Sequence, residues 1–267
     1  MKVHVCIIIG FGINTDIEMA QAFSLVGAQT TRIHLNDLIK NPSQLSKFGI
    51  FVLPGGFSFG DHIGSGAMLA ALIRRTLRDH LVKFIDRGGL VLGVCNGFQV
   101  LVRLGLVPGI IPWKQSVALV HNDSGRYEDR WVEVKFDSIS PCLWTRNIGV
   151  LPLPVRHGEG KLVAPIDCME EIEAAHLCVA RYGKRGKNGI FNEITVPYPA
   201  NPNGSLNNFA GLCDRTGQVL GLMPHPEAFL YRYHHPGWRN AEMKQQADLS
   251  DGALQLFRNA VNYAAVN

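Results

Sequence analysis

The chain carries the run LVLGVCNGFQ at residues 90–99, and this stretch decides the expected fold. Leu90–Val94 is a short apolar segment of the kind that forms a buried strand. Cys95 follows at once, and apolar residues from Phe98 to Leu104 predict a helix closed by Gly105. A strand that turns directly into a helix is typical of a parallel sheet covered by helices.

The first third of the chain repeats this alternation. Apolar runs predict strands, and segments with helical spacing or capping signals predict helices. The expected strands cover residues 3–9, 30–35 and 49–53, and the expected helices cover residues 15–27 and 66–86. Thr15 and Glu18 stand three residues apart at the start of the first helix, which predicts a capping box.

The middle of the chain, residues 115–222, changes character. Residues 130–136 alternate apolar and polar positions, as antiparallel strands with one solvated face do. Residues 251–264 have helical spacing and are expected to pack back on the sheet. We therefore expect one domain over residues 1–267, an α/β flavodoxin-like three-layer sandwich with a mostly parallel central sheet and additional antiparallel strands.

Composition excludes several classes of protein. Hydrophobic residues make up 46% of the chain and charged residues 18%, a balance that indicates a globular protein rather than a disordered one. A net charge of +4 without a long basic stripe argues against nucleic-acid binding. Residues 3–9 are too short to span a membrane and are not followed by an export cleavage signal. We expect a cytoplasmic protein without a membrane partner.

The cysteine pattern speaks against a metal site. None of the six cysteines forms a C-x-x-C pair, so zinc and thioredoxin-like sites are not expected. Disulfides are unusual in a reducing compartment, and most of these thiols are expected to be buried. The cysteines are Cys6, Cys95, Cys142, Cys168, Cys178 and Cys213.

Cys95 stands out because Gly93 and Gly97 flank it in the form of a nucleophile elbow. Such a turn holds the side chain in a strained backbone geometry, and the flanking glycines allow close packing. The turn also places the thiol at a helix N-terminus, where the dipole favours the thiolate. Taken alone, the motif favours a buried structural cysteine.

Residues 221–227, GLMPHPE, supply the groups that a nucleophilic cysteine needs. His225 can take the thiol proton, and Glu227 can orient the imidazole and stabilise its protonated form. Taken alone, this pair is equally consistent with a surface histidine in a rigid loop. A metal site would need further ligands nearby, and none has suitable spacing.

Residues 53–61, LPGGFSFGD, form a glycine-rich turn directly after an expected strand. Backbone N–H groups in such a turn point into the crevice at the strand ends. The N–H of Gly56 could then pair with that of Asn96 to form an oxyanion hole. No Lys-Ser/Thr pair follows at the spacing of a phosphate-binding loop.

The combination of these motifs, in this order, closely resembles the class I (triad) glutamine amidotransferases. Within that family the chain is most similar to the glutaminase subunits of phosphoribosylformylglycinamidine synthases of purine biosynthesis. Residues 54–61, 93–99, 201–205 and 221–227 carry this closer resemblance. The resemblance implies that Cys95 is the nucleophile, His225 the base and Glu227 its orienting acid, with backbone N–H groups of Gly56 and Asn96 as the oxyanion hole.

The resemblance also implies substrate contacts. Gln99 would contact the glutamine, and the loop containing Asn122 and Ser124 would help hold its α-amino and carboxylate groups. His157 matches a family histidine near the pocket, with a structural turn histidine as the alternative. Residues 229–250 are longer than in short relatives, and we expect a surface extension there that could face a partner.

The implied reaction is hydrolysis of L-glutamine to glutamate and ammonia. The ammonia would pass to an ATP-dependent synthetase subunit that converts formylglycinamide ribonucleotide to formylglycinamidine ribonucleotide, with a small accessory subunit as a further possible partner. No cofactor is expected in this chain, since ATP and magnesium would bind the synthetase. The alternatives are an amidotransferase for another acceptor, a stand-alone cysteine amidohydrolase and a non-catalytic subunit of the same fold.

Overall fold

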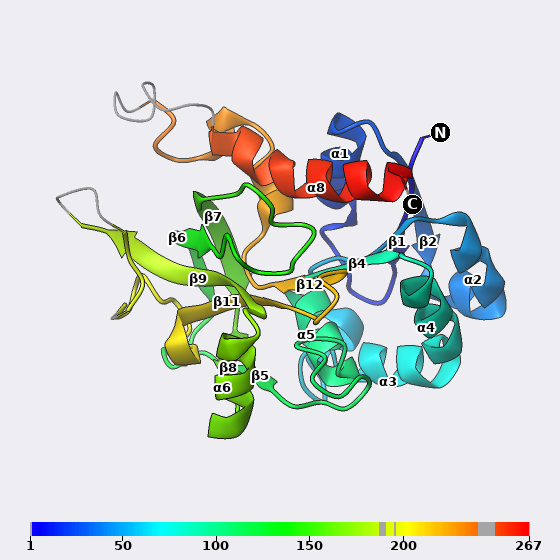
Figure 1. Ribbon diagram of the computed structural model, residues 1–267, viewed down its shortest axis with the longest axis horizontal. Helices are drawn as coiled ribbons and strands as arrows, with labels where there is room; N and C mark the ends of the chain where they lie inside the picture. The colour runs from blue at the N-terminus through cyan, green and yellow to red at the C-terminus, as the bar shows by residue number, and fades with distance from the viewer. Residues whose placement is uncertain (1, 187–190, 195, 240–248, 267) are drawn as a thin grey trace.

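The computed structural model describes residues 2–186, 191–194, 196–239 and 249–266 (Figure 1). A ten-stranded sheet runs through the molecule in the order β2-β1-β3-β4-β12-β11-β9-β6-β7, and β10 pairs with β9. The first five strands of this order are parallel: β2 Gln29–His34, β1 His4–Ile9, β3 Ile50–Leu53, β4 Leu90–Val94 and β12 Val219–Leu222.

The other half of the sheet is antiparallel. Its strands are β11 Phe209–Cys213, β9 Cys178–Arg185, β6 Glu128–Phe136, β7 Val150–His157 and β10 Phe191–Asn192. A separate two-stranded sheet joins β5 Ala118–His121 to β8 Glu159–Val163. The expected α/β class is confirmed, with a parallel region extended by antiparallel strands.

Helices cover both faces of the parallel half. In Figure 1, α1 and α8 lie on one side of the sheet, and α3, α4 and α5 lie on the other. The helices are α1 Asp16–Leu25, α2 Leu35–Lys40, α3 Ala67–Thr76, α4 Arg78–Asp86, α5 Asn96–Leu104, α6 Ile166–Ala174 and α8 Leu249–Val266. Five short 3-10 helices complete the described elements: η1 Pro42–Lys47, η2 Ser58–Asp61, η3 Leu206–Asn208, η4 Pro226–Ala228 and η5 Arg232–His234.

The C-terminal helix returns to the start of the chain, as its spacing predicts. The Phe257 ring on α8 meets the Phe23 ring on α1 edge to face, with ring centroids 5.0 Å apart. Both rings are fully buried. This aromatic pair stabilises the contact between two elements that lie more than 200 residues apart in the sequence.

Three expectations about local structure are wrong. Thr15 makes no capping hydrogen bond at the start of α1, because its hydroxyl accepts the Gly55 N–H at 2.8 Å instead. The expected helix over 66–86 is divided at Leu77, which leaves helical geometry and buries its side chain. The helix after Cys95 begins at Asn96 rather than at Phe98.

The segment at residues 229–250 is only partly at the surface. Phe229 and Leu230 are buried, and the Phe229 ring packs edge to face on Trp131 with centroids 5.0 Å apart. The expected surface extension therefore begins after Leu230, since its first two side chains are apolar and join the core. Residues 240–248 of this segment lie outside the described part of the chain.

Candidate active site

Cys95 occupies a strained turn between β4 and α5. Its backbone has φ 51° and ψ −106°, a left-handed φ that non-glycine residues rarely adopt. Gly93 and Gly97 make this turn possible because the chain has no space for a side chain at either position. A Cβ at Gly97 would clash with the Leu53 carbonyl oxygen of β3, and one at Gly93 would clash with the Gly97 carbonyl.

Topology brings His225 to the same edge of the sheet. β12 pairs in parallel with β4, and the Cys95 N–H donates to the Leu222 carbonyl at 2.7 Å. The chain leaving β12 therefore passes directly beside the Cys95 turn. The His225 N–H donates to the Pro154 carbonyl of β7 at 2.8 Å, which anchors the histidine loop.

His225 and Glu227 form a buried ion pair. The imidazole Nδ1 lies 2.7 Å from Glu227 Oε1, and the two side chains are 2% and 1% exposed. The second imidazole nitrogen, Nε2, has no hydrogen-bond partner among the described residues. A carboxylate on Nδ1 fixes the tautomer and ring orientation, so Nε2 is left for proton transfer.

The electrostatics of this pair favour a protonated imidazole. Burial lowers the pKa of His225, but the Glu227 carboxylate and Cys95 raise it by more, to about 10. The imidazole therefore favours its protonated form at neutral pH, as it must when it takes the proton of a thiol. This is the requirement for a cysteine nucleophile paired with a histidine.

Cys95, His225 and Gly56 line one cavity of about 200 Å³. Cys95 is 5% exposed, and its thiol donates to the Arg156 carbonyl at 3.4 Å. Gly55 lies between the two reactive side chains, since a Cβ there would approach His225 Cε1 at 2.8 Å and Cys95 Cβ at 3.5 Å. A residue larger than glycine would displace the imidazole.

Two backbone donors at this site are unused. The N–H groups of Gly56 and Asn96 donate to no group in the described part of the chain. The Asn96 side chain ties the two loops together, because its oxygen accepts the Ser58 N–H at 3.1 Å and its amide donates to Asp61 at 3.1 Å. The glycine-rich turn after β3 is thereby held against the cysteine turn.

Gln99 is placed behind this arrangement. Its side chain is 5% exposed, donates to the Glu159 carbonyl at 2.6 Å and accepts the Asn96 amide at 2.9 Å. It does not line the cavity that contains Cys95. In this structure Gln99 connects α5 to the start of β8.

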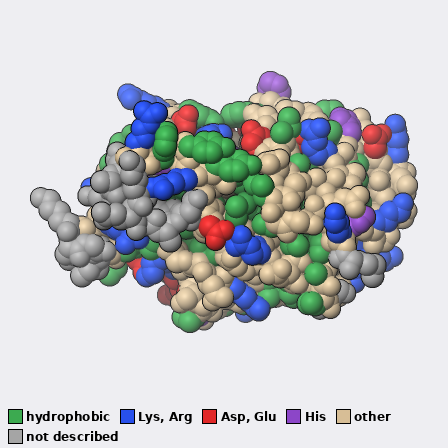
Figure 2. Space-filling view, turned by 90° about the horizontal axis from the view of Figure 1, so that it is seen from above, with side chains coloured by type: hydrophobic (Ala, Val, Ile, Leu, Met, Phe, Trp, Pro, Cys, Tyr) green, Lys and Arg blue, Asp and Glu red, His purple; other side chains and the backbone are tan. Residues whose placement is uncertain are grey.

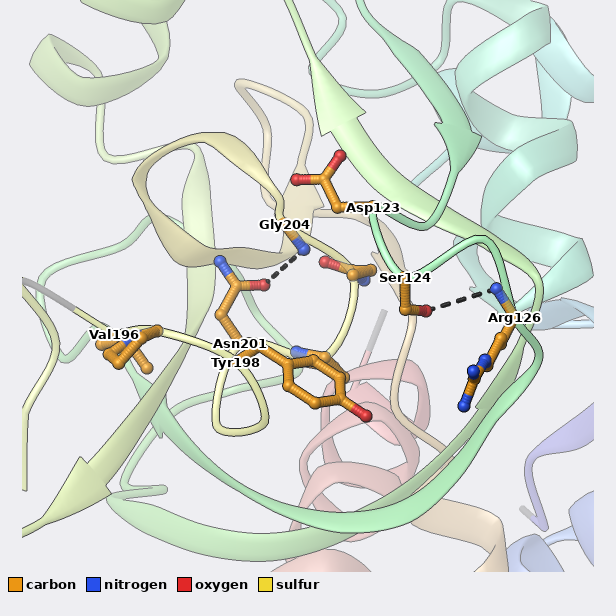
Figure 3. A pocket seen from close by; sticks show the side chains of 10 residues that line it. Asp123, Ser124, Arg126, Val196, Tyr198, Asn201 and Gly204 are labelled. Atoms are coloured by element: carbon orange, nitrogen blue, oxygen red, sulfur yellow. Dashed lines mark hydrogen bonds between the residues drawn. The ribbon is translucent and has the colours of Figure 1, made fainter.

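Asn122 and Ser124 lie elsewhere. The Asn122 amide donates to the Arg126 and His157 carbonyls at 2.9 and 2.8 Å, and Asn122 is buried. Ser124 lines a second cavity of about 530 Å³, between the loop at 122–126 and the loop at 196–204 (Figure 3). The structure does not bring Ser124 into the cavity of Cys95.

His157 is a second buried histidine with the opposite tendency. Its Nδ1 lies 3.1 Å from Asn122 Oδ1, and its Nε2 has no partner among the described residues. Burial and the nearby charge of His225 lower the pKa of His157 to about 3. His157 therefore stays neutral, and its contact with Asn122 links the end of β7 to the loop after β5.

Six further residues line the cavity, and only some of them lie in a sequence motif. The cavity is also lined by Asn14, Thr15, Glu18, Phe57, Tyr127 and Arg156. They come from the start of α1, the turn after β3, the approach to β6 and the end of β7. Thr15 and Glu18 belong to the predicted capping box and Phe57 to the glycine-rich turn, but neither pattern indicates a shared cavity, which only the folded chain forms.

Comparison with known proteins agrees with the geometry of the site. The CobB/CobQ-like glutamine amidotransferase domain matches residues 2–264. The chain belongs to this glutamine amidotransferase family. The resemblance expected from the motifs is confirmed.

Relatives of this amidotransferase match over nearly their whole length. The phosphoribosylformylglycinamidine synthase subunit PurQ of Dehalococcoides mccartyi is 40% identical, over 98% of each chain. The subunit of the same name from Methanococcus maripaludis is 39% identical, over 97% of this chain and 96% of its own. The structure of PurLQS from Thermotoga maritima has a TM-score of 0.71 at 27% identity and covers 98% of this chain and 99% of its own.

A more distant amidotransferase supports the fold alone. A glutamine amidotransferase from Thermotoga maritima has a TM-score of 0.52 at 16% identity, with both chains fully covered.

Among the described residues, no group of three or more His, Cys, Asp or Glu side chains is arranged to hold a metal ion. The helices in the same described ranges include none that is long and apolar enough to cross a membrane.

Proposed function

We propose that this chain is the glutaminase subunit of a phosphoribosylformylglycinamidine synthase, with Cys95 as nucleophile. The observation that carries the proposal is the buried His225–Glu227 pair, whose histidine lines the same cavity as Cys95. Full-length similarity to subunits named PurQ supports the choice of pathway. The proposed reaction converts L-glutamine and water to glutamate and ammonia.

The reaction has two halves. His225 takes the Cys95 proton, the sulfur attacks the amide carbon of glutamine, and His225 returns the proton to the departing nitrogen, which leaves as ammonia. The product is a glutamyl thioester on Cys95. His225 then takes a proton from water, the resulting hydroxide attacks the thioester, and the proton returns to the sulfur as glutamate leaves.

Gly56 and Asn96 support the proposed chemistry through their free N–H groups. Negative charge develops on the former amide oxygen in both halves of the reaction, and these donors are available to receive it. One oxyanion donor is typically worth about 3 kcal/mol, or on the order of a hundredfold in rate. The hydrogen bonds of the Asn96 side chain hold the two loops that carry these donors together.

Ammonia would be consumed by a partner. We assign that role to an ATP-dependent synthetase subunit that converts formylglycinamide ribonucleotide to formylglycinamidine ribonucleotide, with a small accessory subunit as a further partner. The Thermotoga relative was solved as PurLQS, which is consistent with assembly. ATP and magnesium would bind the synthetase rather than this chain, and the complex would work in the cytoplasm as part of one enzyme.

We further propose that residues 1–267 form one amidotransferase domain. The family match covers 2–264, and one sheet joins strands from both ends of the chain. An indirect role of Gln99, Asn122 and Ser124 in substrate binding belongs to the same proposal. Because their side chains lie outside the Cys95 cavity, Gln99 and Asn122 would act by positioning its walls.

Reconstitution with the synthetase tests the proposed function. The complex containing this chain should form formylglycinamidine ribonucleotide from either glutamine or added ammonia. With Cys95→Ala, the glutamine-dependent rate should fall at least about a thousandfold, since the nucleophile is gone, while the ammonia-dependent rate stays unchanged. Retained glutaminase activity would refute the assignment of Cys95, and glutamine hydrolysis without product would indicate another acceptor.

A further inference from the structure

Two exposed side chains of opposite charge line the cavity beside Cys95 and have no partner in the described part of the chain. Glu18 on the first turn of α1 and Arg156 near the end of β7 both line it. Neither side chain makes a hydrogen bond or ion pair within the described ranges of the chain. Neighbouring acids do have partners, since Asp16 pairs with Arg32 at 2.8 Å and Glu159 lies 3.9 Å from His121.

Both the backbone and the side chain of Arg156 lie beside the cavity. Its carbonyl accepts the Cys95 thiol at 3.4 Å. Its guanidinium lies near Tyr127, another wall residue: burial, Cys95 and Asp129 raise the pKa of the Tyr127 hydroxyl, and Arg156 lowers it. The backbone of Arg156 therefore contacts Cys95, and its positive charge lies on the Tyr127 side of the cavity.

We propose that Arg156 binds the α-carboxylate of the substrate glutamine and that Glu18 binds its α-ammonium group. This proposal rests on the proposed function and adds the recognition of the amino-acid head group. A zwitterion would give both side chains the partner that they lack, and a guanidinium fork matches a carboxylate in geometry. The side-chain amide would then extend toward Cys95.

Cavity size fits the same ligand. A volume of about 200 Å³ equals the space of roughly six or seven water molecules at about 30 Å³ each, enough for one free amino acid. Glutamine has only ten non-hydrogen atoms, whereas a peptide would need a longer groove. Two opposite charges on the wall of the cavity that contains Cys95 favour a free amino acid over an uncharged amide.

The loop at 122–126 is a less suitable place for the head group. It borders the second cavity, which does not include Cys95 or His225. Its one carboxylate, on Asp123, is already paired with Lys161 at 2.5 Å. A glutamine bound there would not have the cysteine in the same cavity.

Two electrophiles separate head-group recognition from nucleophile reactivity. 6-Diazo-5-oxo-L-norleucine carries the same α-carboxylate and α-ammonium groups as glutamine, whereas iodoacetamide carries neither. In the full chain, Arg156→Met and Glu18→Gln should each slow alkylation of Cys95 by the glutamine analogue about 10- to 100-fold. Alkylation of Cys95 by iodoacetamide should stay within twofold of the unaltered chain.

Controls are available on distant surfaces. Arg75→Met and Glu170→Gln remove exposed charges of the same kind that have no partner in the described structure, and both should leave the two rates unchanged. Protection of Cys95 by glutaramate, which lacks the α-ammonium group, should be insensitive to Glu18→Gln.

Equal effects on both electrophiles, or no effect on either, would overturn the head-group assignment. Failure of the unaltered chain to react with the glutamine analogue would instead refute the proposed function.

Discussion

The two buried histidines show how single residues set the chemistry of the site. Burial lowers the pKa of both, but only His225 has a carboxylate on its ring nitrogen. Glu227 and Cys95 raise the pKa of His225 to about 10, whereas the pKa of His157 falls to about 3. Neighbouring titratable groups that are shifted in opposite directions are typical of an active site.

Replacing Glu227 with Gln should make the free energy of unfolding less dependent on protonation of His225. The His225 pKa is about 6.5 in an unfolded chain and about 10 in the folded one, so the ion pair contributes fully below pH 6.5 and is lost as pH rises through 10. Glu227→Gln should therefore lower the free energy of unfolding most near pH 6 and least above pH 10. Denaturant unfolding at a series of pH values measures this.

Glu170→Gln serves as the matched control for that series. Glu170 is exposed, and its replacement should leave the free energy of unfolding nearly constant across the pH range. A deficit in Glu227→Gln that stays constant, or that grows with rising pH, would show that Glu227 does not hold the proton of His225.

Local motifs predict the reactive residues better than the residues that surround them. The sequence places Cys95 on a strand-to-helix turn and puts His225 two residues from Glu227, and the structure joins them in one site. The sequence assigns Glu18 only to a capping box and gives Arg156 no role, and the two residues stand on separate elements. Their unpaired state in one cavity is visible only after folding.

At the scale of elements, the site depends on the close fit of α5 against β3 and β4. Gly97 touches the Leu53 carbonyl, so an added methyl group has no space without moving the helix or the strand. Gly97→Ala should lower the free energy of unfolding by about 1–3 kcal/mol, as overpacking in a dense core does. It should also lower glutaminase activity, because the Cys95 turn would shift.

Gly149→Ala is the control for this change. Gly149 is exposed, has no heavy atom near its added Cβ and has an ordinary φ. Thermal or denaturant unfolding of the two variants should separate them clearly. Equal stability of Gly97→Ala and Gly149→Ala would show that the close approach to β3 is not needed.

Element type was more predictable than element pairing. Apolar runs located β1, β3 and β4 within a residue or two, because buried parallel strands have few other signals to compete with. The pairing of β12 with β4 could not be predicted, since Val219–Leu222 is a short apolar run without periodicity. Yet this pairing delivers His225 to Cys95.

The whole molecule places its chemistry at the carboxyl ends of three adjacent parallel strands. β3, β4 and β12 end at the glycine-rich turn, the cysteine turn and the histidine loop. Ligands of open α/β sheets bind at this edge. On the described part of the face in Figure 2, Lys and Arg side chains are scattered among neutral ones, in keeping with a net charge of only +4.

The other five cysteines provide an internal comparison for the reactivity of Cys95. All six cysteines are free and buried. Burial raises the pKa of the Cys6 and Cys178 thiols to about 12, which leaves almost no thiolate at neutral pH. Of the six, only Cys95 lines the cavity with His225.

The most direct test is mass spectrometry of the full chain after treatment with 6-diazo-5-oxo-L-norleucine. We predict modification of Cys95 alone among the six cysteines, and protection of Cys95 when glutamine is present in excess. Modification of another cysteine in place of Cys95, or labelling of Cys95 that glutamine does not slow, would contradict the conclusion that this residue attacks the substrate.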